Sequence, residues 1–71
     1  MNSDQSIIES AYQDAIKSLY STLFGAYAAA IGDAGQMREA DQRFMAGVGA
    51  ARSSRDRAVA LLGESAAAGG A

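Results

Sequence analysis

The stretch from Leu19 to Ile31 reads LYSTLFGAYAAAI, and it constrains the fold more than any other part of the chain. Eleven of its thirteen residues are apolar or glycine, so a helix built from it has almost no polar side. The stretch is too short to cross a bilayer, which takes about 20 apolar residues. A helix that is apolar nearly all round has to be covered by protein. We therefore expect a second helix, and in part a second chain, to cover this one.

The size and composition of the chain favour association. A chain of 71 residues forms at most one small domain, whose core rarely contributes more than about 3–5 kcal/mol. Cysteine and histidine are absent, which excludes disulfides and the common zinc sites. The net charge of −2 argues against nucleic-acid binding, which uses a basic face. Oligomerisation or a protein partner remains as a source of added stability.

The first residues, MNSDQSIIES, lack the basic segment and apolar core of a secretory signal. We therefore expect a cytoplasmic protein without a membrane span, with signal-less export as the alternative.

Apolar residues recur at helical spacing from Ile8 to Ala30, which predicts a first helix over about residues 4–31. Ser3 and Ser6 are both candidates for its N-cap. Nothing in the sequence alternates as a strand does, so the predicted fold class is all-α.

The segment Ile31-Gly32-Asp33-Ala34-Gly35-Gln36 predicts a turn over residues 32–35. Gly32 suits the left-handed position that ends a helix, and Asp33 suits the cap of the next one. A second helix is predicted over about residues 34–62, because apolar residues recur every seven positions along it at Met37, Phe44, Ala51 and Ala58. Gly63 is expected to end it and to leave residues 64–71 as a flexible tail. Two glycines beside Asp33 disfavour one continuous helix.

The short connection predicts an antiparallel hairpin over residues 1–63, in which residues whose numbers add to about 66 lie opposite each other. Large residues of the first helix then face mainly small ones of the second, in the pairs Leu19–Gly47, Tyr20–Ala46 and Leu23–Phe44. Glycines inside helices cost about 1 kcal/mol each, so Gly47 and Gly49 favour close approach of the helices near Tyr20, with a hinge as the alternative.

Arg52, Arg55 and Arg57 form the densest charged segment of the chain. The same register brings Arg57 and Arg52 near Glu9 and Asp14, so ion pairs between the helices are expected there. Contact with an acidic partner or a phosphate group is the open alternative.

Enzyme chemistry is not expected. The serines have no histidine beside them to act as a base, and the Glu-x-x-His motif of four-helix di-iron sites is missing. We therefore predict no catalytic residue, no cofactor and no metal.

Two resemblances concern the layout of the chain. Two helices joined at Gly32-Asp33-Ala34-Gly35-Gln36 in about 70 residues resemble the hairpin co-chaperones of type III secretion needle subunits. Leu19-Tyr20 followed by an alanine-rich helix resembles the subunits of bacterial self-assembling ribbons, the R-bodies. These resemblances imply coiled-coil contact with a subunit, or self-assembly, and they assign a role to no individual residue.

We therefore expect a helical hairpin that dimerises into a four-helix bundle or binds a helical partner. The expected function is protein–protein interaction, as an adaptor, co-chaperone or assembly subunit; the alternative is a subunit of a homopolymer. The predicted interface covers about 1,000–2,000 Å² and consists of Leu19, Leu23, Phe24, Tyr27, Ile31, Met37, Phe44, Met45 and Val48. Phe24, Tyr27, Ala28 and Ile31, near the turn, are the part that the hairpin itself leaves uncovered.

Overall fold

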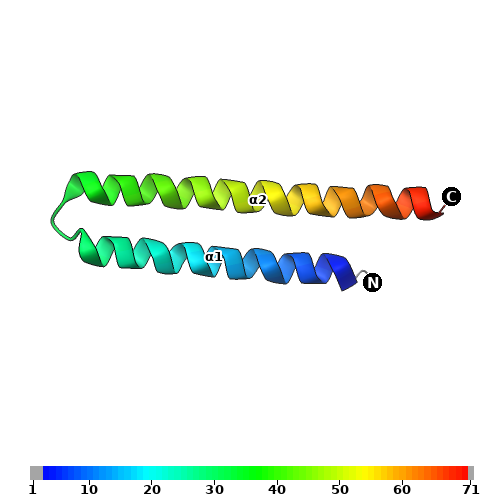
Figure 1. Ribbon diagram of the computed structural model, residues 1–71, viewed down its shortest axis with the longest axis horizontal. Coiled ribbons are helices and arrows are strands. Elements are labelled where there is room, and N and C mark those ends of the chain that lie inside the picture. Colours follow the sequence, from blue (N-terminus) through cyan, green and yellow to red (C-terminus); the bar gives the residue numbers. More distant parts are fainter. Residues whose placement is uncertain (1–2, 71) are drawn as a thin grey trace.

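The computed structural model describes the backbone of residues 3–70 and the side chains of residues 3–64. Two helices make up this part of the chain, α1 over Ser3–Ala29 and α2 over Ala34–Gly70. They run antiparallel, so the start of α1 and the end of α2 lie at the same end of the molecule (Figure 1). The predicted all-α hairpin is therefore confirmed, as a thin slab of 59 × 16 × 9 Å.

The connection between the helices follows the predicted chemistry closely. α1 ends at Ala29 rather than Ile31, and Gly32 adopts a φ of +87°. This left-handed conformation costs a residue that has a Cβ about 1–2 kcal/mol, so glycine is the residue that fits. Asp33 caps α2, because its Oδ1 accepts a hydrogen bond of 3.1 Å from the backbone N–H of Gln36. The break between the two helices thus has a backbone cause and a side-chain cause.

The end of α2 differs from the sequence prediction. The helix passes through Gly63, where we expected it to end, and continues to Gly70. Gly63 does not adopt a positive φ, and the alanines of the following segment favour helix. We also expected residues 64–71 to form a flexible tail. The side chains of residues 65–71 lie outside the described part of the chain, so the flexibility of this segment stays a prediction. α2 therefore projects past the start of α1 (Figure 1).

The predicted register is confirmed at Gly47, which lies against Leu19. A Cβ added to Gly47 would meet the Leu19 side chain, including Cδ1 at 3.2 Å and Cγ at 3.4 Å. Close approach is confined to this glycine, because Gly49 faces open space. The pairing of Tyr20 with the second helix is wrong, since Tyr20 is 60% exposed. The space at Gly47 is taken by Leu19 instead.

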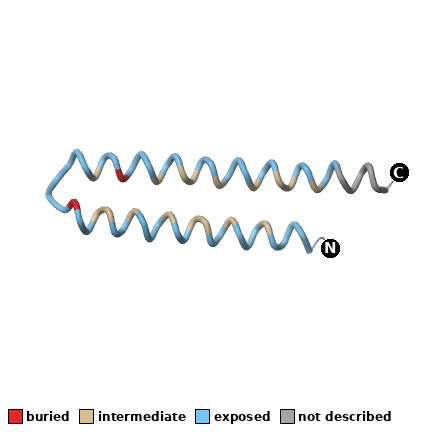
Figure 2. Tube along the Cα trace, viewed as in Figure 1, coloured by how far each residue is buried: buried red, intermediate tan, exposed pale blue. Residues whose placement is uncertain are grey.

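Very little of the hairpin is fully buried. Ala30 and Ala40, each 5% exposed, are the buried hydrophobic residues of the described part, and both lie near the turn (Figure 2). The larger apolar side chains between the helices are half-buried: Ile8, Tyr12, Ile16, Leu19, Leu23, Tyr27, Met37, Phe44, Val48, Val59 and Leu62. A single layer of two helices can cover each of these side chains from one side only.

Candidate interaction surface

Four large apolar side chains stay exposed on the turn half of the hairpin. Their exposed fractions are 60% for Tyr20, 65% for Phe24, 84% for Ile31 and 64% for Met45. Phe24 follows Tyr20 by four residues, which places these two on one stripe of α1, and Ile31 lies two residues past the end of that helix. We call these four residues the apolar ridge.

A hydrogen bond between the helices shows that both parts of the ridge lie on the same broad face. The Tyr27 hydroxyl donates to the Asp41 carboxylate across the contact between α1 and α2. Tyr27 lies on the α1 stripe seven residues after Tyr20, and Met45 lies one helical turn after Asp41 on α2. Tyr20 and Met45 therefore flank the same side of the contact, so the ridge extends over both helices.

The opposite broad face is hollowed along the line between the helices. Thr22 lies between Tyr20 and Phe24 in sequence, and at about 100° per residue it points roughly 160–200° away from each of them. Arg43 stands in the same relation to Met45. Thr22 and Arg43 both line a recess of about 100 Å³ in the middle of the hairpin, which therefore opens away from the ridge.

Two further recesses continue this hollow in both directions. Toward the turn, a recess of about 250 Å³ shares Ala26, Ala40 and Arg43 with the middle one. Toward the open end, a recess of about 270 Å³ includes Ala11 and Ser54, which lie three helical turns from Thr22 and Arg43 along the same stripes. We call these three recesses together the alanine groove.

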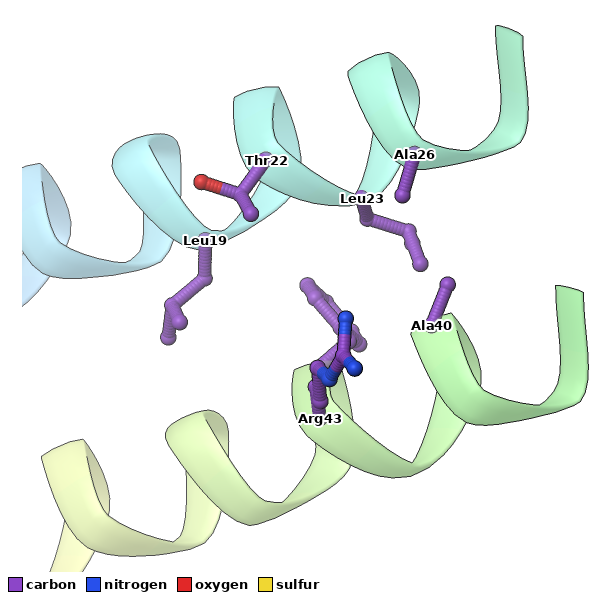
Figure 3. A pocket seen from close by; sticks show the side chains of 7 residues that line it. Leu19, Thr22, Leu23, Ala26, Ala40 and Arg43 are labelled. Atoms are coloured by element: carbon purple, nitrogen blue, oxygen red, sulfur yellow. The ribbon is translucent and has the colours of Figure 1, made fainter. Parts of the chain in front are cut away.

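Small side chains explain why this face is hollow. Leu19 and Leu23 reach from α1 toward α2, whereas Ala26 and Ala40 leave space between the helices (Figure 3). On the ridge face, larger residues such as Ile16, Tyr27 and Val48 occupy the corresponding positions and are half-buried. The two faces of the slab thus differ in shape, one raised and one hollow.

The structure divides the nine predicted interface residues into two groups. Phe24, Ile31 and Met45 are exposed and belong to the ridge. The other six are half-buried along the contact between the helices: Leu19, Leu23, Tyr27, Met37, Phe44 and Val48. The exposed group is the part that a partner can cover without opening the hairpin.

Sequence reasoning missed Tyr20, because it placed this residue against α2. Its spacing of four residues from Phe24 is the signal that could have identified it. Ile7 and Leu61, which are 65% and 46% exposed, were also missed. They lie near the open end of the hairpin, far along the chain from the turn.

The predicted ion pairs of Glu9 with Arg57 and of Asp14 with Arg52 are wrong for the described residues. Arg57 lies 4.0 Å from Glu64 along its own helix. Arg55 donates to Asp56 and stacks over the Tyr12 ring with its Cζ 4.3 Å from the centroid. The antiparallel register brings these residues to the same end, but Arg55 and Arg57 each have an acceptor on α2 that is closer.

Two side chains of the described residues have shifted pKa values. The hydrogen bond to the Asp41 carboxylate raises the pKa of Tyr27 above its usual 10.0, because the neutral hydroxyl is the donor. The hydrogen bond from Arg55 to Asp56 stabilises the charged guanidinium and raises the pKa of Arg55. The shift of Tyr27 comes from a contact between the two helices, and that of Arg55 comes from a contact with its neighbour in α2.

Within the described residues, no three potential metal ligands among His, Cys, Asp and Glu lie close enough together to hold an ion. In the same part of the chain, neither helix combines the length and apolar character that a membrane span needs. Comparison with protein-family models, with curated proteins and with solved structures finds no match to this chain.

Proposed function

We propose that this chain is a small helical module that binds another helical protein surface through the apolar ridge. The observation that carries the proposal is the 60–84% exposure of four large apolar side chains on the turn half of the hairpin. Apolar patches of this kind mark interaction surfaces, and aromatic residues and methionine are enriched at the centre of interfaces. Adaptor, co-chaperone and assembly subunit are the roles open to such a module.

The composition of the interior supports the same proposal. Its buried hydrophobic residues in the described part are two alanines, so the hairpin obtains little stability from its own core. Covering the ridge removes apolar area from water at about 25 cal/mol per Å². The four ridge residues, Tyr20, Phe24, Ile31 and Met45, make the contact, and half-buried side chains between the helices lie beneath it: Leu19, Leu23, Tyr27, Met37, Phe44 and Val48.

Photo-cross-linking tests this function in cells that express the chain. A benzophenone amino acid replaces Phe24 in one variant and Ser21 in a matched variant, since Ser21 is exposed on α1 but lies off the ridge. We expect a discrete protein adduct from position 24 and none from position 21. Equal adducts from both positions, or none from either, would contradict the proposal.

A further inference from the structure

We infer that the ridge of one copy of this chain docks into the alanine groove of a second copy, so that the hairpins stack face to back. This inference rests on the proposed function and names the partner. The ridge and the groove are properties of the same chain on opposite sides of the same slab. A contact of this kind joins two different surfaces, and each bound copy still presents a free ridge and a free groove.

The dimensions of the two surfaces are compatible. An apolar cavity of about 150 Å³ accommodates a benzene ring. The recesses toward the turn and toward the open end, at about 250 and 270 Å³, exceed that volume, whereas the middle recess, at about 100 Å³, has room for a smaller group. The slab is 59 Å long and 16 Å wide, which is the size of face that a standard interface covers at about 800 Å² per partner. One copy therefore offers both side chains of the right bulk and space of the right volume.

Charge also favours an uncharged occupant of the groove. Arg43 on its rim lies 3.9 Å from Glu39, four residues away on α2, so the rim carries both signs. The four ridge residues carry no charge at neutral pH. A strongly acidic or basic segment would gain nothing from such a rim, whereas the ridge of a second copy brings no charged side chain of its own into the groove.

The geometry predicts a particular kind of assembly. A symmetric dimer would use the same patch twice, ridge against ridge, and would stop at two chains. A ridge-to-groove contact is heterologous, so it continues into an open stack or closes into a ring. The mass of the wild-type assembly therefore exceeds that of a dimer at high concentration.

Complementation between two variants tests this contact. Phe24→Ser damages the ridge and leaves the groove, whereas Thr22→Glu puts a charged side chain into the groove and leaves the ridge. We expect each substitution to weaken self-association by roughly 30-fold or more and each variant to be a monomer in sedimentation equilibrium. Mixed in equal amounts, they should form a heterodimer that does not grow, joined by the one intact ridge and the one intact groove.

Matched controls are available for both variants. Ala60→Ser on α2 and Ser21→Glu on α1 introduce the same residue types at exposed positions that belong to neither surface, and they should assemble as the wild type does. Circular dichroism checks that each variant stays helical. If Phe24→Ser lowers the helix content, Met45→Ser on α2 replaces it as the ridge variant.

Three results would overturn the inference: a wild type that stays monomeric, a Thr22→Glu variant that still forms a plain dimer, and a mixture that forms no heterodimer. The proposed function is judged separately. A wild type without self-association, combined with a cross-link from position 24 to another protein in cells, would remove the second copy as the partner and keep the ridge as the binding surface.

Discussion

At the scale of single residues, Gly47 sets how closely the two helices approach. The Leu19 side chain occupies the place that a Cβ at Gly47 would take. Glycine weakens a helix by about 1 kcal/mol relative to alanine. Gly47 therefore lowers the stability of α2 itself but lets the Leu19 side chain pack closely against it. Gly49, two residues later, has open space around it and carries the same cost without the same contact.

This contrast predicts opposite outcomes for two alanine substitutions. Gly49→Ala should stabilise the fold by about 0.5–1 kcal/mol, because it improves helix propensity and meets no neighbour. Gly47→Ala should give no gain or destabilise by about 1–2 kcal/mol, because Leu19 has to shift. Urea unfolding followed by circular dichroism at one fixed protein concentration measures both changes.

The same measurement in a Leu19→Ala background isolates the contact. With the Leu19 side chain truncated, Gly47→Ala should become about as stabilising as Gly49→Ala. Equal effects of the two glycine substitutions in the wild-type background would show that Leu19 does not occupy this space.

Tyr27 is the residue through which pH acts on the contact between the helices. Its pKa is raised in the folded state by the hydrogen bond to Asp41. The stabilisation from this bond is therefore complete below the pKa of the unfolded chain, about 10, and is lost as pH rises through the folded-state value. We expect the unfolding midpoint of the wild type to fall over this alkaline range more steeply than that of Tyr27→Phe.

Tyr20→Phe is the control for this pH dependence, because Tyr20 is exposed and donates no hydrogen bond to a carboxylate within the described residues. It should retain the steep alkaline loss of the wild type. A Tyr27→Phe variant with an unchanged pH profile would contradict the role of the bond to Asp41.

At the scale of the helices, the two glycines that look like helix ends in the sequence, Gly32 and Gly63, behave differently. α1 ends before Gly32, whose φ is +87°, whereas α2 continues through Gly63 without a positive φ. Position in the sequence pattern alone makes both look like helix stops. What separates them is the neighbour that follows, since Asp33 caps a new helix while the residues after Gly63 favour continuation.

A matched pair of substitutions tests this difference. Gly32→Ala should destabilise the hairpin by about 1–2 kcal/mol, since alanine is strained in the left-handed conformation. Gly63→Ala should stabilise it by up to about 1 kcal/mol and raise the helical signal, because the position is helical and has open space around it. A loss of helical signal in Gly63→Ala would mean that the second helix ends where the sequence pattern alone suggested.

At the scale of the whole molecule, the hairpin is one layer deep and has two different faces. Its thinnest extent is 9 Å, so the larger side chains between the helices keep one side near water. Stability that the layer lacks by itself comes from covering a face. Association and folding are therefore expected to be linked.

This linkage predicts a melting temperature that depends on protein concentration. The midpoint of the wild type should rise over about a hundredfold increase in concentration, because association stabilises the folded state by mass action. Phe24→Ser should melt at one temperature throughout, since it lacks the central aromatic residue of the ridge. A constant midpoint for the wild type would show that the isolated hairpin is stable without a covering chain.

The sequence by itself determined that there are two helices, where the turn between them lies, and that Leu19 lies opposite Gly47. Helical spacing of apolar residues predicted both elements, Gly32 and Asp33 predicted the break, and the bulk of Leu19 predicted its place against Gly47. These are local or one-dimensional properties, because propensity, capping and the offset between two antiparallel helices depend on residue order alone.

Only the tertiary structure decided which face carries the ridge, which face carries the groove, and which side chains form a hydrogen bond between the helices. The helical period gives the angle of each side chain around its own helix, but packing sets how far each helix turns toward its neighbour. That rotation exposes Tyr20, brings Tyr27 to Asp41 and leaves the alanine groove behind Thr22. It also leaves Arg55 and Arg57 closer to acids on α2 than to those on α1. The ridge and the groove are therefore consequences of packing that no pattern along one helix contains.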